Sequence, residues 1–267
     1  MTQVICFTNM EYIYYDSIDS TNDEAKRLIK QGRIVDETCL IAKEQTGGRG
    51  RQGKSFFSPD SGLYMTVVLP IGKSISSQVT MTVRTACAVS EAIESVTGIK
   101  TGIKWVNDIY VRGKKCCGIL CEAINDYEKG IMEYMVAGIG INITTKNWPE
   151  ELKDLAGSLY EADEMSDAEG LNNVRKIHNL QSITDNLAKT ISQNLTIWME
   201  KDSSELLMYY RAHSIVLGKE ITYIENGTEQ AATAIDIDDD GGLVVKNISD
   251  NSIMTLRSGE ISVRVSK

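Results

Sequence analysis

Alternating apolar and polar positions divide the first part of the chain into strands and one helix. Strands are predicted for three segments, 11–18, 38–45 and 62–70. The third is expected to end at Pro70, because proline cannot donate a backbone hydrogen bond. Thr21 and Glu24 have the spacing of a capping box, which predicts a helix that begins at Thr21.

Helical periodicity follows, and then a series of buried strands. Apolar residues recur at spacings of three and four in a predicted long helix that Gly98 ends, namely Val79, Val83, Ala86, Val89, Ile93 and Val96. Three near-continuous apolar segments predict a central sheet covered on both faces, 99–106, 116–124 and 133–143. An acidic, irregular connection is expected over 150–172, and a helical stretch over 173–210.

The pattern changes after residue 213. Five short strand-like segments follow, separated by Asn-Gly, Asp-Gly-Gly and Ser-Gly turns: GKEITYI, QAATAIDI, DGGLVVK, SIMTL and GEISVRV. They predict a small barrel or sandwich. We therefore expect two domains, 1–213 and 214–267.

Composition and charge narrow the function. The chain has 267 residues, 42% hydrophobic and 24% charged, which is typical of a globular protein with a sizeable core. Its net charge of -9 and pI near 4.9 argue against a sequence-independent polyanion binder. Two segments are nevertheless basic, because 43–54 and 104–115 each hold four bases and one acid. These two cationic islands suggest a site for a small anion.

Cysteine usage and the N-terminus favour a cytoplasmic protein. The cysteines fall mostly in apolar runs, the N-terminal residues do not resemble a signal peptide, and no stretch reaches ~18 apolar residues. We therefore expect reduced thiols and no membrane association. A metal cluster of Cys116, Cys117 and Cys121 is the alternative, but these cysteines form no CxxC pair and the only histidines are His178 and His213. Buried small side chains are the favoured interpretation, and metal ligands stay unknown.

The first island contains a glycine-rich loop. Residues 48–55 (GRGRQGKS) match both the P-loop and the dinucleotide-binding strings. Both of those sites need a helix directly after the loop, whereas Pro59 and Gly62 interrupt this segment before a strand. The favoured interpretation is a mobile loop whose Arg49 and Arg51 clamp a phosphate or carboxylate. A flexible hairpin with solvated charges is the alternative.

The second island lies between two predicted strands. KWVND (104–108) ends one strand in turn-forming residues, and Lys114 and Lys115 open the next. A lysine at the mouth of a buried strand can hold an anion, although a surface hairpin lysine explains the pattern equally well. Asn142, which ends GIGIN (138–142), could hydrogen-bond a base or cap the strand end.

Taken together, these strings resemble biotin protein ligases, which make biotinoyl-AMP and pass biotin to a carrier lysine. The resemblance runs over about 12 to 264 in family order: STN (20–22), QxxGRGRxGK (45–54), FFSP and GLY (56–64), KWxND (104–108), KxxGIL.E (115–122), GIGIN (138–142), GSL (157–159) and GEISVR (259–264). Val106 replaces the usual proline of KWPND, which leaves open how Asn107 is positioned. Cys117 replaces a common alanine.

The resemblance implies an α+β fold. It comprises a mixed central sheet flanked by helices, as in class II synthetase-like catalytic domains, and a small C-terminal SH3-like β-barrel. It also implies an ATP-dependent carbon–nitrogen ligase, a biotin-[acetyl-CoA-carboxylase] ligase that uses ATP and Mg²⁺. Its partners would be biotin, ATP and biotin carboxyl carrier protein, and a homodimer could form through an exposed sheet edge beside the ligand loop.

Site residues follow from the resemblance, position by position. Biotin would bind against Ser20, Thr21, Asn22, Gln45, Gly48, Arg49, Gly50, Arg51, Lys115 and Gly118. ATP would bind Arg51, Phe56, Asn107, Lys115 and Asn142. Arg49 and Arg51 would close over the carboxylate and α-phosphate, Lys115 would bridge them, and Asp108 would orient or deprotonate the incoming lysine. STN also suits a helix N-cap, and Phe56 could simply be a packed aromatic.

Two alternatives stay open. A lipoate-type acyl-adenylate ligase would share the fold but should lack the paired GRGRxG and KWxND strings. A non-catalytic biotin sensor would keep Ser20, Thr21 and Gln45 yet need no Lys115. Many relatives also repress transcription through an N-terminal winged helix-turn-helix, but the 19 residues before Ser20 are too few for one, so we expect no direct DNA binding.

Overall fold

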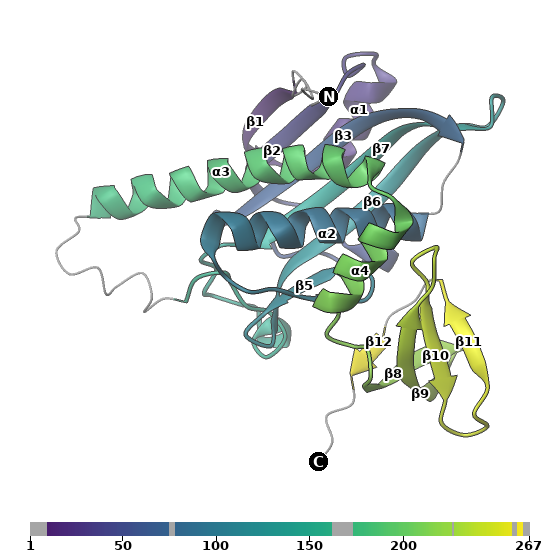
Figure 1. Ribbon diagram of the computed structural model, residues 1–267. Coiled ribbons are helices and arrows are strands. Elements are labelled where there is room, and N and C mark those ends of the chain that lie inside the picture. The colour runs from purple at the N-terminus through teal and green to yellow at the C-terminus, as the bar shows by residue number, and fades with distance from the viewer. Residues whose placement is uncertain (1–9, 75–77, 162–172, 226, 258–260, 264–267) are drawn as a thin grey trace, which may run out of the picture.

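The computed structural model describes residues 10–74, 78–161, 173–225, 227–257 and 261–263. Its main feature is a mixed sheet with the strand order β1-β2-β3-β7-β6-β5-β4 (Figure 1). The strands are β1 (Glu11–Ile18), β2 (Thr38–Gln45), β3 (Gly62–Ser74), β4 (Gly102–Lys104), β5 (Asp108–Val111), β6 (Lys114–Asp126) and β7 (Ile131–Asn142). β1 and β2 are parallel, and the other pairs are antiparallel. The predicted mixed sheet is confirmed.

Helices cover both faces of this sheet. α2 (Gln78–Thr97) and α3 (Asn173–Glu200) cross one face together, and α1 (Thr21–Lys30) packs on the other (Figure 1). Alternation along β2 divides its side chains accordingly: Cys39 and Ile41 join the larger core with α2 and α3, while Leu40 joins the smaller core with α1. Within the described residues, no helix is long and apolar enough to cross a membrane.

The start of α1 differs from the prediction in one detail. The helix begins at Thr21 as expected, but its cap is the preceding residue, Ser20, whose Oγ accepts a hydrogen bond from the Asp23 amide at 3.4 Å. The capping box of Thr21 and Glu24 does not form, because the Thr21 hydroxyl binds Gln45 and the Glu24 carboxylate pairs with Arg27. The Thr21 side chain is thereby directed towards the sheet.

Two strand predictions are corrected. β3 continues past Pro70 to Ser74, since the pairing with β7 shifts register between Pro70 and Lys73. Such an irregularity accommodates a residue that cannot donate to the ladder. Of the segment 99–106, only β4 is a strand, and it lies at the sheet edge in a hairpin with β5.

The apolar end of that segment is buried by the C-terminal part of the chain instead of by sheet neighbours. Trp105 and Val106 lie in the turn between β4 and β5, joined by a cis peptide bond. Trp105 Nε1 donates to the Gly241 carbonyl at 3.0 Å, and the Tyr210 hydroxyl donates to the Val106 carbonyl at 3.3 Å. The apolar pattern therefore indicated burial correctly but assigned the wrong partner.

The predicted helical stretch 173–210 is two helices. α3 ends at Glu200, and α4 (Ser203–His213) begins after Asp202, whose carboxylate accepts from the Glu205 amide at 2.9 Å. The 3₁₀ turn η2 (Glu150–Leu152) lies in the predicted acidic connection. Residues 162–172 of that connection lie outside the described residues.

The C-terminal strands form a separate antiparallel sheet beside α4, as predicted (Figure 1). Its order is β11-β10-β9-β8-β12, with β8 (Glu220–Glu225), β9 (Thr228–Ile237), β10 (Leu243–Asn247), β11 (Ile253–Leu256) and β12 (Ile261–Val263). Its apolar side chains belong to the same core cluster as α2 and α3. The boundary near residue 213 stays a prediction.

Five cysteines are buried, free thiols, which agrees with their interpretation as small core side chains: Cys39, Cys87, Cys116, Cys117 and Cys121. Burial raises the pKa of the Cys39 and Cys116 thiols to about 12 and that of Cys121 to about 11. These thiols are therefore protonated at neutral pH. Cys6 lies outside the described residues.

Trp105→Phe should destabilise the protein by about 1–3 kcal/mol, because it removes the donor to the buried Gly241 carbonyl between β9 and β10. Urea unfolding followed by circular dichroism measures the free energy of unfolding. Trp148→Phe is the matched control, since Trp148 is only partly buried and lies outside this contact. Equal unfolding free energies for the two variants would contradict the role of the indole hydrogen bond.

Candidate functional site

Two adjacent strands carry glycines at the point where Phe56, just after the glycine-rich loop, lies on the sheet. Gly118 of β6 is paired with Gly140 of β7, and the Phe56 ring lies on both. A Cβ at Gly140 would lie 2.5 Å from a carbon of that ring, and one at Gly118 would lie 2.9 Å from it. The ring also makes an edge contact with Tyr64. Phe56 thus forms one wall of the site directly against the sheet backbone.

The start of α1 approaches the same face. Asn22 lies over Gly138, where a Cβ would be 2.3 Å from Asn22 Oδ1. Asn22 Nδ2 donates to the Leu120 carbonyl at 3.2 Å and to Glu122 Oε2 at 2.9 Å, while Oδ1 accepts from the Thr66 hydroxyl at 2.6 Å. These bonds use both amide hydrogens. The geometry therefore makes Asn22 a support of the site, and its expected contact with biotin stays a prediction.

A chain of polar side chains continues from Asn22 to the loop. The Thr66 hydroxyl also lies 2.8 Å from the Thr21 hydroxyl, and the Thr21 amide and hydroxyl both reach Gln45 Oε1, at 2.9 and 3.1 Å. Gln45 Nε2 donates to the Ser58 hydroxyl at 3.1 Å, which donates to the Phe56 carbonyl at 2.9 Å. The predicted residues Thr21 and Gln45 are thus brought together, and their oxygen and nitrogen atoms have fixed directions.

These elements line a small cavity of about 30 Å³, which we call the polar cavity after the hydrogen-bonding side chains in its mixed polar and apolar lining. It is lined by Ser20, Thr21, Asn22, Gln45, Arg49, Phe56, Met65, Gly118, Leu120, Gly138, Ile139 and Gly140. At about 10–15 Å³ per water, this volume holds roughly two water molecules. A bicyclic ligand enters only if Phe56 or the glycine-rich loop moves.

The glycine-rich loop itself is a tight hairpin. Arg49 pairs with Ser55 in an isolated antiparallel bridge, and the 3₁₀ turn η1 (Arg51–Gly53) lies between them. Gly48 passes close to the Phe56 carbonyl, 2.4 Å from the position of an added Cβ, so a larger residue would push the strands of the hairpin apart. The chain then runs irregularly to β3, which agrees with the rejection of both phosphate-binding strings.

The two arginines of the loop point to different partners. Arg51 Nη1 donates to Asn107 Oδ1 at 3.1 Å, whereas Arg49 Nε pairs with Asp23 Oδ2 of α1 at 2.7 Å. Asp23 Oδ1 is also 3.0 Å from Lys26. The two guanidinium groups therefore contact different partners in this conformation, and their joint clamp on a ligand stays a prediction.

The second cationic island lies on the other side of Phe56. Asn107 Nδ2 donates to the Ile119 carbonyl at 3.0 Å, so β6 holds this side chain although Val106 replaces the usual proline. Lys115 Nζ is 2.7 Å from Asp108 Oδ1, and its Cε lies 3.4 Å from the position of a Cβ on Gly118. The loop and the second island thus meet through the contact of Arg51 with Asn107.

Asn142 lies at the end of β7 and is 3% exposed. Its Nδ2 donates to the Gly157 carbonyl at 3.1 Å, and its Oδ1 has no hydrogen-bond partner among the described residues. A buried, unpaired acceptor is costly unless a donor reaches it. This makes Asn142 a candidate contact for a ligand amine or amide.

Sequence reasoning missed the polar residues that support the site, chiefly Thr66, Asp23, Lys26 and Glu122. Thr66 is fully buried and binds both Thr21 and Asn22. A threonine within an otherwise apolar strand was the available signal. Glu122 ends the string KxxGIL.E (115–122), but the string alone indicates no role for this carboxylate.

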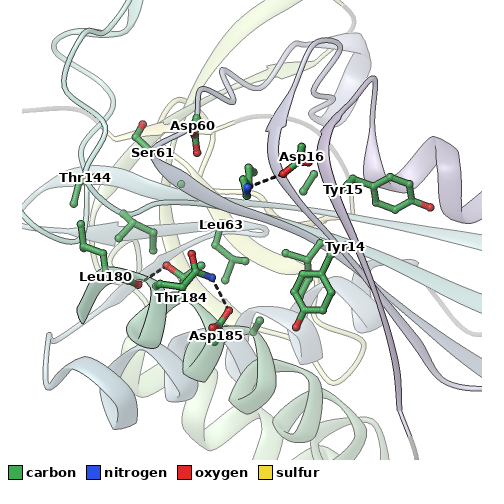
Figure 2. Close-up of a pocket in the computed structure, with 17 residues that line it drawn as sticks. Tyr14, Tyr15, Asp16, Asp60, Ser61, Leu63, Thr144, Leu180, Thr184 and Asp185 are labelled. Atoms are coloured by element: carbon green, nitrogen blue, oxygen red, sulfur yellow. Dashed lines mark hydrogen bonds and ion pairs between the residues drawn. The ribbon is translucent and has the colours of Figure 1, made fainter. Parts of the chain in front are cut away.

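A larger hollow lies on the opposite face of the sheet. It has a volume of about 490 Å³ and lies between α3 and the ends of β1, β2 and β3, with Tyr14, Asp60 and Asp185 among its lining (Figure 2). None of the predicted site residues lines it. Within the described part of the chain, no three His, Cys, Asp or Glu side chains are grouped to hold a metal ion.

Comparison with known proteins gives consistent matches. Residues 14–142 match the Biotin/lipoate A/B protein ligase family. The "Bifunctional ligase/repressor BirA" of Bacillus spizizenii is 37% identical over 153 residues, which make up 56% of this chain and 46% of that relative. The "Biotin--[acetyl-CoA-carboxylase] ligase" of Mycobacterium tuberculosis is 26% identical over 233 residues, 84% of this chain and 79% of the relative. The chain thus spans less than half the length of the Bacillus relative.

Structural similarity extends over almost the whole chain. The biotin protein ligase of Aquifex aeolicus, solved in complex with biotin and ATP, superposes with a TM-score of 0.73 and 28% sequence identity. The match covers 96% of this chain and 99% of the Aquifex chain, so it includes both sheets. Residues 14–142 therefore form a domain of the Biotin/lipoate A/B protein ligase family.

Proposed function

We propose that this chain activates biotin with ATP as biotinoyl-5'-AMP and transfers the biotin to a specific lysine of a biotin carrier domain, such as that of acetyl-CoA carboxylase. Support comes from the family match and from relatives that are named as ligases of this kind. The similar Aquifex structure contains both biotin and ATP. The proposed activity is thus that of a biotin-[acetyl-CoA-carboxylase] ligase.

One observation carries the proposal: the two cationic segments meet beside the polar cavity. The loop residue Arg51 contacts Asn107, and Lys115 lies beside Phe56 over Gly118. A neutral, hydrogen-bonding cavity with cations at its mouth suits a ligand that has a polar head group and a terminal carboxylate. It also suits the phosphate that such a carboxylate must approach.

In the first step, a biotin carboxylate oxygen forms a bond to the α-phosphorus of ATP, and the bond to pyrophosphate breaks. Both reactants are anions, so positive charge is the main contribution that the protein must make. Arg49, Arg51 and Lys115 supply it. Mg²⁺ would arrive with the ATP phosphates and add further charge neutralisation. The Asp108 carboxylate and Asn107 amide oxygen are the hard ligands nearby, and Mg²⁺ usually binds through one or two such groups plus phosphates.

In the second step, the carrier lysine amine attacks the acyl carbon, and AMP leaves as the carbon–oxygen bond breaks. The attacking lysine nitrogen must lose a proton as the new carbon–nitrogen bond forms, because the amide product is neutral. Asp108, which is paired with Lys115, would orient this amine or receive its proton. Asn142, with its buried free acceptor, would hold the amino group of adenine or of the incoming lysine.

Loop movement is part of the proposal. The cavity of about 30 Å³ is too small for biotin, so the hairpin and Phe56 must open for substrates and close again. An acyl-adenylate hydrolyses when water reaches it, which makes closure useful during catalysis. The carrier protein, a cytoplasmic location and a homodimer through an exposed sheet edge beside the ligand loop complete the proposal.

Incubation with Mg-ATP, biotin and a biotin carrier domain tests the function directly. We expect mass spectrometry to find biotin on one lysine of the carrier, and a carrier with that lysine replaced by arginine to stay unmodified. ATP–pyrophosphate exchange with biotin or lipoate separates the two acyl substrates. Biotin binding without exchange would indicate a sensor and contradict the ligase assignment.

Lys115→Ala should reduce biotinoyl-AMP formation by about 10² or more, because it removes a charge that faces two reacting anions. ATP–pyrophosphate exchange at saturating biotin measures the rate. Lys114→Ala is the matched control: its Nζ donates to the Lys153 carbonyl at the surface, so its activity should stay near that of the unmodified chain. Equal rates for the two variants would remove Lys115 from the proposed mechanism.

Gly140→Ala should weaken biotin binding roughly tenfold, since its Cβ would overlap the Phe56 ring and overpacking typically costs about 1–3 kcal/mol. Isothermal titration calorimetry measures the dissociation constant. Adding Phe56→Leu should restore part of the affinity by relieving the overlap. If the single variant binds biotin as well as the unmodified chain, the Phe56 ring does not form the wall of the binding site.

A further inference from the structure

Four charged side chains form an alternating row from the sheet to the glycine-rich loop. Glu122 Oε1 on β6 is 2.8 Å from Lys26 Nζ, which is 3.0 Å from Asp23 Oδ1. Asp23 Oδ2 is in turn 2.7 Å from Arg49 Nε. We call these residues the ion-pair row. It joins three segments that are far apart in sequence, and it ends on an arginine that lines the polar cavity.

Burial differs strongly along the row. The side chains of Asp23, Lys26 and Glu122 are 17%, 32% and 31% exposed, whereas that of Arg49 is 61% exposed. Burial is the largest single influence on the Lys26 pKa and lowers it, but the hydrogen bonds to Glu122 and Asp23 outweigh burial and raise the pKa overall. Lys26 is therefore charged at neutral pH. The inner part of the row is fixed, and the outer part is a long side chain at the surface.

We propose that Asp23 is a positioning residue that holds the Arg49 guanidinium at the mouth of the cavity, with Lys26 and Glu122 anchoring Asp23. This inference rests on the proposed function, because it assumes that Arg49 meets the biotin carboxylate. A free arginine at the surface samples many rotamers, and each must be given up when an anion binds. Prior fixation of the side chain reduces that loss, which strengthens binding.

The geometry allows Arg49 to bind an anion while it is held. The ion pair uses Nε, so the two terminal nitrogens can still face a carboxylate, which prefers such paired donors. Lys26 offsets the negative charge of Asp23, and the N-terminus of α1 stabilises that charge as well. The carboxylate therefore repels an incoming anion less than an isolated aspartate would.

Asp23 also stabilises α1, and an experiment must separate this effect from its effect on Arg49. Asp23 lies in the first turn of α1, where any acid stabilises the helix. Glu24 lies in the same turn but pairs with Arg27 instead of the loop. Glu24→Gln is therefore a matched control, since it removes the same helix-terminal charge and leaves the ion-pair row intact.

We expect Asp23→Asn to raise the dissociation constant for biotin about tenfold in calorimetry and to raise KM for biotin by a similar factor in pyrophosphate exchange. The value of kcat at saturating biotin should change less than twofold, and Glu24→Gln should leave all three values unchanged. Asp23→Glu, which keeps the charge, should restore part of the affinity. In an Arg49→Ala background, Asp23→Asn should have no further effect, because the residue that it positions is gone.

Three results would overturn the inference. Unchanged binding in Asp23→Asn would show that Arg49 needs no support, and tighter binding would show that Asp23 competes with the ligand for the arginine. An equal loss with and without Arg49 would show a structural role only. Each of these results leaves the proposed function intact, provided that the unmodified chain binds biotin and carries out the exchange. A chain that binds no biotin overturns both.

Discussion

Close contact between the glycines of β6 and β7 and the side chains above them determines the rest of the site. The antiparallel register places Gly118 opposite Gly140, and Gly138 on the same face two residues away. Phe56 and Asn22 fill the depression so closely that a methyl group at Gly138 or Gly140 would overlap them. Since protein interiors are close-packed, this shape fixes how near the loop and α1 can approach the sheet. Every polar contact described for the cavity depends on that approach.

Hydrogen-bond pairing then sets the chemistry of the cavity. Buried polar groups need partners, and here one side chain satisfies the next, from Gln45 through Thr21 and Thr66 to Asn22 and Glu122. Because Asn22 uses its amide hydrogens within this network, its orientation is fixed before any ligand arrives. Because the side chains of this network hold one another, the donors and acceptors that are left for a ligand point in set directions. This is the preorganisation that a binding site for a polar head group requires.

Local patterns predicted the elements well, and long-range contacts less well. The bounds of β2 and the first residue of α1 agree with the sequence, although Ser20 caps the helix in place of the predicted capping box, because alternation and helix starts are properties of neighbouring residues. The segment 99–106 was misassigned, because an apolar run indicates that residues are buried but not which element covers them. For the same reason, the sequence located Arg49 but gave no sign of Asp23 as its partner. Pairings of this kind depend on how a loop, a helix and a strand are brought together by the whole fold.

The three cations of the site, Arg49, Arg51 and Lys115, differ in what holds them. Arg49 and Lys115 are each paired with a carboxylate, Asp23 and Asp108, and Asp23 is shared with Lys26. Arg51 instead contacts the neutral amide of Asn107, and that contact leaves its positive charge in place. Of these three cations, Arg51 is therefore the one that is held by a neutral partner and not by a carboxylate. Arg49 and Lys115 are held in place by their carboxylates, so the charge that they bring to the reacting anions has a set direction. An acidic protein can in this way bring positive charge from the loop and from β6 to one site.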